Sequence, residues 1–193
     1  MSALAPMGIA YLSAMLKQEG FTVDLFDTTF YPSDITSNEN EEKVQLNCVL
    51  PFSWEERGIK QKENDMLADF REKVAAFQPD LLAYSVVENT WIVADVMLRS
   101  LEHRIPTIVG GVFATFAPEI VIAHDLVDYL CRGEGELPLV RLCKQLAAGR
   151  DVTSIPNIWV KQDGQIHRNA VGPGIRMDDL PYPDWSLFEE QSL

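Results

Sequence analysis

The chain has 193 residues, 47% of them hydrophobic, which suits one domain with a buried core. Its formal net charge of −13 argues against nucleic acid or an anionic membrane as a partner. No apolar run approaches the roughly 20 residues that a membrane helix needs. The first residues lack a basic region, so we expect no signal peptide.

The three cysteines, Cys48, Cys131 and Cys143, lie far apart and form no CxxC pair. Zinc or iron–sulfur ligation within this chain is therefore not predicted. Buried free thiols in a reducing cytoplasm are the simpler interpretation.

The first part of the chain alternates helical and strand patterns around one irregular stretch. Apolar residues at helical spacing before Gly20 predict a first helix, and alternation after it predicts a strand. A long polar stretch then predicts an insertion with little regular structure, in which Phe52 and Trp54 either fold back as a lid or lie on the surface. The predicted elements are a helix at 7–19, a strand at 21–27, the insertion at 28–64, a helix at 65–77 and a strand at 80–87.

The same alternation continues to residue 150. Asn89 or Thr90 is expected to cap one helix and Thr115 to cap another. The predicted elements are helices at 91–103, 116–124 and 136–148 and strands at 107–111 and 127–131. Alternation of this kind predicts an α/β domain over residues 1–150, with a parallel sheet and helices on both faces. No strand precedes the first helix. Either the sheet has four strands here, or its first strand lies upstream.

The character of the sequence changes after residue 150. Two short apolar runs flank Asp163 and Gly164, which predicts a β-hairpin extension at 151–172. Residues 173–193 contain closely spaced prolines that prevent a regular helix until the last few positions. We interpret them as a linker toward a further domain.

Three predicted strands end in residues suited to a ligand. They end at Ser85, at Gly110 and Gly111, and in the sequence "RGEGE" from Arg132. In an open parallel sheet, ligands bind outside the carboxyl ends of the strands. Glycines let a bulky ligand approach the backbone, and a serine hydroxyl can donate or accept a hydrogen bond. The alternative is that the glycines only allow tight turns and that Ser85 bonds a nearby carbonyl.

Several other chemistries are not supported. "GEGELP" is not G-x-G-x-x-G, because Pro138 replaces the third glycine, and its glutamates repel phosphate. The sequence contains no P-loop. Asp27 ends a predicted strand, but the acidic pair that would hold magnesium in a phosphorylated receiver domain is absent. None of His103, His124 and His167 lies in a strand-to-helix loop, so no nucleophilic triad can be assembled. We expect Arg132 to pair with Glu134 or Glu136 and to fix the shape of the turn.

The residues resemble a known family. "PMGIAYLSAMLKQEGFTVDLFD", "PDLLAYSVV", "PTIVGGVFATFAPE", "VDYLCRGEGELPLVRL" and "IPNIWVKQDGQIHRN" follow in the order found in the N-terminal cobalamin (B12)-binding domain of B12-dependent radical SAM enzymes. The closing "DDLPYPDWSLF" resembles the segment that leads to the radical SAM barrel. The similarity covers nearly the whole chain except the insertion.

The resemblance implies a flavodoxin-like, Rossmann-like fold that holds cobalamin between its strand ends and the barrel of the same parent chain. The parent would be methyltransferase-like, with its [4Fe-4S] cluster and S-adenosylmethionine in the domain absent here. The implied cofactor-binding residues are Ser85, Val86, Val87, Gly110, Gly111, Val112, Arg132, Gly133 and Glu134.

Two family motifs are absent from the sequence. There is no D-x-H-x-x-G, whose histidine coordinates cobalt in other B12 proteins, so no metal ligand is predicted. There is also no C-x-x-x-C-x-x-C cluster motif, so we expect no catalysis from this chain alone. Two alternatives stay open: a B12-type fold that has lost its ligand and acts as a docking module, and a flavin-binding protein, which the lack of a Ser/Thr-rich phosphate loop disfavours.

Overall fold

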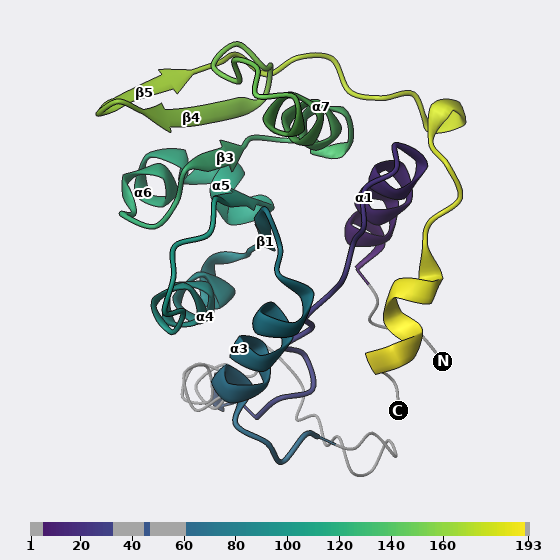
Figure 1. The fold of residues 1–193 in the computed structure, drawn as a ribbon, viewed down its shortest axis with the longest axis vertical. Helices are drawn as coiled ribbons and strands as arrows, with labels where there is room; N and C mark the ends of the chain where they lie inside the picture. The colour runs from purple at the N-terminus through teal and green to yellow at the C-terminus, as the bar shows by residue number, and fades with distance from the viewer. Residues whose placement is uncertain (1–5, 33–44, 47–60, 192–193) are drawn as a thin grey trace.

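The computed structural model describes residues 6–32, 45–46 and 61–191 (Figure 1). Most of the insertion predicted at 28–64, including Cys48, Phe52 and Trp54, therefore lies outside the described residues. The α-helices are α1 (Met7–Gln18), α3 (Met66–Phe77), α4 (Glu88–Arg99), α5 (Val112–Phe116), α6 (Pro118–Ala123) and α7 (Glu136–Ala147). The strands are β1 (Leu82–Ser85), β2 (Thr107–Gly110), β3 (Tyr129–Cys131), β4 (Ile158–Gln162) and β5 (Gln165–Arg168). Short 3₁₀ helices follow as η2 (Met177–Asp179) and η3 (Trp185–Gln191).

The strands form a single five-stranded sheet in the order β1-β2-β3-β4-β5. β1, β2 and β3 are parallel, whereas β4 and β5 are antiparallel to their neighbours. The predicted α/β fold and the hairpin are both confirmed. The hairpin turns at Asp163 and Gly164, which both have positive φ. It continues the main sheet by pairing with β3, so Tyr129 lies opposite Val160.

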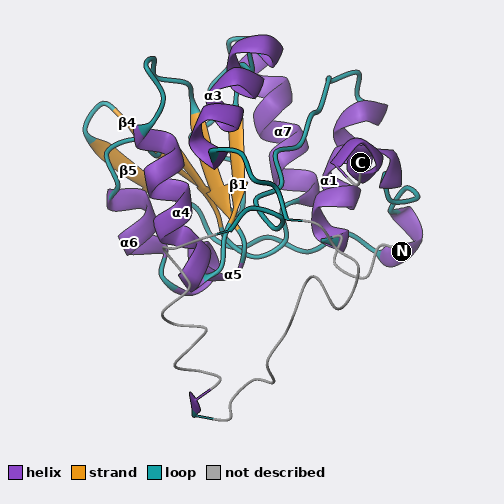
Figure 2. Cartoon of the chain, turned by 90° about the horizontal axis from the view of Figure 1, so that it is seen from below, coloured by secondary structure: helices purple, strands orange, loops and turns teal. Residues whose placement is uncertain are grey.

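Helices cover both faces of this sheet (Figure 2). Neighbouring strand residues point to opposite faces, and in β2 Val109 and Ile108 belong to separate core clusters. The Val109 cluster packs against α4, α5 and α6, and the Ile108 cluster packs against α1 and α7. Because helices cover both faces, the ends of the strands are the part of the sheet that a ligand can reach. In the described residues no helix is long and apolar enough to cross a membrane.

The strand predicted at 21–27 was wrong: these residues form no ladder. A strand needs a neighbouring backbone, and β1 pairs with β2 alone among the described strands. Packing against other elements explains the apolar alternation. Phe26 stacks on Tyr31 and packs against Phe70 of α3, and Asp24 forms a 2.9 Å ion pair with Lys73. The expectation of a strand upstream of α1 stays a prediction.

Two predicted helix caps also differ in the structure. α4 begins at Glu88, and Thr90 supports its first turn by accepting a hydrogen bond from the Val87 amide at 3.0 Å. The helix predicted at 116–124 is divided into α5 and α6, because Pro118 begins a new helix rather than continuing the old one. Thr115 therefore lies inside α5, and its hydroxyl donates to the Gly111 carbonyl at 2.9 Å.

After β5 the chain crosses the molecule and returns to α1 (Figure 1). It passes α7 as an extended segment, forms η2 and ends beside α1 as η3. The last described residues therefore lie next to the first helix.

Candidate functional site

The three predicted ligand-binding stretches share one edge of the sheet. The parallel register of β1 and β2 places Ser85 opposite Gly110. The register of β2 and β3 continues to Gly110 and Cys131, and a Cβ built on Gly110 would lie 3.7 Å from the Cys131 Cβ. The carboxyl ends of β1, β2 and β3 are therefore neighbours, and we call them the strand-end edge.

The loop after β1 is fastened to the loop after β2. The buried Val86 donates its amide to the Gly110 carbonyl at 3.0 Å and accepts from the Phe113 amide at 3.1 Å. Its neighbours point outward: Ser85 is exposed, and Val87 retains 48% of its accessible surface. Beyond β2, Val112 is 59% exposed. The edge therefore presents one hydroxyl and two apolar side chains to its surroundings.

The two glycines after β2 have different structural roles. Gly111 has a φ of +95°, and a Cβ there would lie 2.6 Å from the Val86 carbonyl oxygen. Glycine is required at this position because two loop backbones approach closely. At Gly110 the nearest atoms to a built Cβ are at 3.7 and 4.0 Å, which is ordinary contact. A methyl group is therefore tolerated at Gly110, whereas Gly111 is explained by close packing within the chain.

The expected pairing of Arg132 with Glu134 or Glu136 was wrong. Among the described residues Arg132 forms no ion pair with either glutamate. Its guanidinium lies over the Trp159 ring, 5.3 Å from the centroid, where a cation–π interaction holds it. Sequence spacing placed the glutamates nearby, but β4 supplies an aromatic partner from further along the chain.

Asn157 fixes the shape of the RGEGE turn. This buried residue donates its side-chain amide to the Arg132 carbonyl at 2.9 Å and to the Glu134 carbonyl at 3.3 Å. Its side-chain oxygen accepts from the Gly172 amide at 2.8 Å. Sequence reasoning missed this residue. The only local signal was an asparagine just after Pro156, a type that adopts positive φ readily, and its φ is +70°.

Thr115 joins the RGEGE turn to the loop after β2. Its hydroxyl oxygen accepts a 3.0 Å hydrogen bond from the Gly133 amide while the hydroxyl donates to the Gly111 carbonyl. The predicted cap is thus a bridge across the strand-end edge. No pattern in the sequence indicates a bond between residues 18 positions apart.

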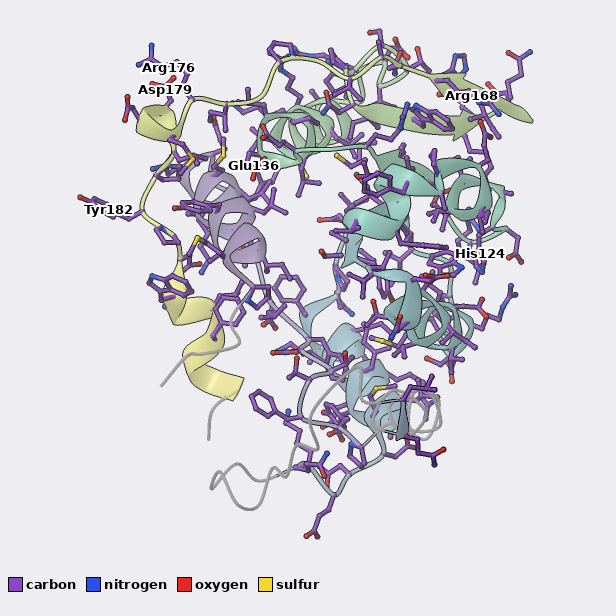
Figure 3. All side chains as sticks on the ribbon, turned by 180° about the vertical axis from the view of Figure 1, so that it is seen from behind. His124, Glu136, Arg168, Arg176, Asp179 and Tyr182 are labelled. Atoms are coloured by element: carbon purple, nitrogen blue, oxygen red, sulfur yellow. The ribbon has the colours of Figure 1, made fainter. Side chains whose placement is uncertain are left out.

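No catalytic group is evident at this edge. Burial, with a smaller contribution from the Glu136 carboxylate, raises the pKa of Cys131 to about 12, so its thiol stays protonated. His124 lies at the far side of the molecule from Glu136, where it contacts Asp95 at 2.6 Å (Figure 3). In the described ranges no group of three or more His, Cys, Asp or Glu residues could hold a metal ion.

Two buried polar atoms of the RGEGE turn have no partner. Within the described part of the chain, Oε2 of Glu136 accepts no hydrogen bond and Nε of Arg132 donates none. Together with the exposed Ser85 hydroxyl, they offer polar contacts to a ligand. The fold is thus that of an α/β domain, and the strand-end edge is its candidate ligand site.

The family comparison agrees with this class. Residues 52–143 match the family model of the B12 binding domain. This stretch of the chain is similar to the B12 binding domain. The recognition made from the sequence motifs is therefore confirmed.

Two relatives show how much of a longer protein this chain covers. An uncharacterized methyltransferase of Pyrococcus horikoshii is 24% identical over 189 residues, which is 95% of this chain and 34% of that protein. The anaerobic magnesium-protoporphyrin IX monomethyl ester cyclase of Cereibacter sphaeroides is 29% identical over 190 residues, 95% of this chain and 26% of the cyclase. The chain thus spans about a third or less of these relatives.

Solved structures support the fold. The cobalamin-dependent S-adenosylmethionine radical enzyme OxsB with aqua-cobalamin bound matches 95% of this chain and 22% of its own, with a TM-score of 0.67 and 17% identity. The radical S-adenosylmethionine methyltransferase TsrM from Kitasatospora setae, with cobalamin and a [4Fe-4S] cluster bound, matches 93% of this chain and 28% of its own, with a TM-score of 0.60 and 19% identity.

Proposed function

We propose that this chain is the cobalamin-binding module of a larger, methyltransferase-like radical SAM enzyme. The observation that carries the proposal is the strand-end edge, where the ends of three parallel strands meet within a chain that matches the B12 binding domain. The names of the Pyrococcus relative and of TsrM support methyl transfer by the parent. The parent is expected in the cytoplasm, in keeping with the free thiols of Cys131 and Cys143.

The residues at the edge divide into groups with different expected contacts. Ser85 offers a hydroxyl to a polar group of the cofactor, and Gly110 has no side chain to obstruct it. The exposed Val87 and Val112 suit an apolar face. Val86 and Gly111 support the loops from behind. Arg132, Gly133 and Glu134 would line the neighbouring rim.

Bound cobalamin would supply a reactive cobalt centre, and this chain would bind and orient it. The [4Fe-4S] cluster and S-adenosylmethionine would belong to the radical SAM barrel of the parent, because these 193 residues contain no C-x-x-x-C-x-x-C. The barrel is the proposed partner of the strand-end edge.

A titration with hydroxocobalamin tests the proposal. The chain and its parent protein are each incubated with the cofactor, passed through gel filtration and examined for a retained cobalamin spectrum. Retention supports the proposal. Absence of retention by both proteins overturns it and favours the docking module, whereas a bound yellow chromophore favours a flavin.

Gly110→Leu is the sharpest variant for this titration. A Cβ at this position meets only ordinary contacts, so the longer side chain obstructs the edge without the backbone clash that any substitution of Gly111 causes. Ala76→Leu, which introduces the same leucine at an exposed position on α3, is the control. We expect Gly110→Leu to lose at least about tenfold in affinity, roughly 1.4 kcal/mol, and Ala76→Leu to bind normally. Equal binding by both variants would place the cofactor elsewhere.

A further inference from the structure

Residues 172–188, which we call the strap, are anchored at both ends. At the first end, the Gly172 amide donates to Asn157, and Gly174 lies against the Glu134 carboxylate so closely that a Cβ there would collide with it. The strap therefore begins on the RGEGE turn. Glycine at position 174 allows this contact because it has no side chain.

The second anchor is Asp184, which binds α1. Its carboxylate accepts a 2.6 Å hydrogen bond from the Ser13 hydroxyl and lies 2.7 Å from the Lys17 ammonium. Its amide donates to the Ala10 carbonyl at 3.0 Å. Ser186 donates a further hydrogen bond to the same carboxylate. The anchor is largely removed from solvent, since the Ser13 residue is 1% exposed and the Asp184 side chain 11%.

The middle of the strap contrasts with its two ends. Met177 is 75% exposed and Tyr182 is 96% exposed, and both Arg176 and Tyr182 point away from the body of the molecule (Figure 3). Local contacts within η2 account for its shape, such as the Asp179 amide donating to the Arg176 carbonyl. The strap is thus held at both ends by polar contacts, and its middle presents exposed side chains to solvent.

The element that receives the second anchor borders the candidate site. α1 packs against α7 and η3, and a Cβ built on Gly135 of the RGEGE turn would lie 3.5 Å from Leu12 of α1. One segment therefore contacts the RGEGE turn at one end and α1 at the other.

We propose that the strap is a positioning device in which Asp184 fixes α1 against the RGEGE turn. The hydrogen bonds from Ser13 and Ser186 and the charge of Lys17 give Asp184 a directional anchor rather than a simple apolar contact. The proposal goes beyond cofactor binding and does not depend on it. Both tests below are made without cobalamin, so their outcome is independent of the proposed function.

Limited trypsin digestion measures release of the strap. Cleavage after Arg176 requires the strap to open, because a protease needs an extended, detached segment. We expect Asp184→Ala to accelerate this cleavage at least about fivefold. Cleavage after Arg150, which lies outside the strap, should keep its rate and thereby report that the domain is still folded. Glu102→Ala is the control, because this exposed carboxylate lies outside the strap and away from the cleaved bond.

Hydrogen exchange measures the effect on α1. Asp184→Ala should increase amide exchange across α1 and leave α4 unchanged. Ser13→Ala, a smaller change, should produce the same pattern more weakly. It replaces Asp184→Ala in both experiments if that variant does not fold. In the double variant Ser13→Ala/Asp184→Ala, the cleavage rate should not exceed that of Asp184→Ala, because both changes remove one contact. The proposal would be overturned if Asp184→Ala showed wild-type rates of cleavage and exchange, or if Glu102→Ala accelerated cleavage after Arg176 equally.

Discussion

The side-chain amide of Asn157 donates a 2.9 Å hydrogen bond to the carbonyl of Arg132, so the residue just before β4 fixes the shape of the turn that follows β3. The same side chain accepts from Gly172, where the strap begins. One buried amide therefore connects the RGEGE turn, the hairpin and the strap.

Replacement of Asn157 should destabilise the domain. Asn157→Ala leaves the Arg132 carbonyl without this donor and places alanine at a φ of +70°, so we expect a loss of about 2–4 kcal/mol in the free energy of unfolding. Asn157→Gly loses the same hydrogen bonds but tolerates the backbone conformation, so it should cost about 1 kcal/mol less. Urea denaturation measures both, and equal losses would contradict the role of the backbone conformation.

Gly110 and Gly111 should respond differently to alanine. At Gly111 the new Cβ meets the Val86 backbone and φ is +95°, so Gly111→Ala should lose at least about 2 kcal/mol. Gly110→Ala introduces only ordinary contacts and should change stability by less than about 1 kcal/mol. Thermal and urea unfolding of the two variants provide the comparison. A larger loss for Gly110→Ala than for Gly111→Ala would contradict the close approach of the two loops at Gly111.

The thiol of Cys131 should make stability depend on alkaline pH. Its pKa is raised by burial to about 12 in the folded chain, against about 8.5 in an unfolded one. Because the folded state favours the neutral thiol, its contribution is complete below about pH 8.5 and is lost as pH rises toward 12. The stability advantage of the wild type over Cys131→Ala should therefore shrink by up to about 1.4 kcal/mol per pH unit between about pH 9 and 11. Urea denaturation under reducing conditions tests this, and a constant difference would contradict it.

Asp184 should show the opposite dependence on pH. Burial acts to raise its pKa, but the hydrogen bonds from Lys17, Ser13 and Ser186 prevail and hold the pKa far below its usual range. Its contribution is therefore present above about pH 4 and is lost as pH falls through the folded-state value. We expect Asp184→Asn to cost about 1–2 kcal/mol at pH 6 and less below pH 4. Urea denaturation of the wild type and Asp184→Asn at each pH measures this cost. A cost that grows as the pH falls would contradict the prediction that the ionised carboxylate of Asp184 stabilises the anchor.

Tyr84 offers a test of an unsatisfied group. In the described residues its buried hydroxyl has no hydrogen-bond partner, and burial raises the pKa of this phenol. Tyr84→Phe removes a desolvated polar group and keeps the ring, so the free energy of unfolding should stay unchanged or rise by about 1 kcal/mol. A clear loss of stability in urea denaturation would reveal a partner for the hydroxyl.

Predictions based on local patterns were the most successful. The helix before Gly20, the strand ending at Ser85 and the hairpin at Asp163 and Gly164 all follow from side-chain periodicity and turn residues. The strand predicted at 21–27 failed for a reason that periodicity cannot report. Alternating apolar residues fit a strand, but a ladder also requires a neighbouring backbone, and Phe26 packs against Phe70 instead.

The candidate site divides in the same way. The sequence alone determined which residues follow the strands, and the parallel order then brought Ser85, Gly110 and the RGEGE turn to one edge. Only the tertiary structure decided their partners: Trp159 for Arg132, Asn157 for the turn and Ser13 for Asp184. The physical reason is the distance along the chain over which each kind of interaction acts. Periodicity and turn chemistry act over a few residues, whereas these contacts join positions up to 171 residues apart and exist only once the sheet has formed.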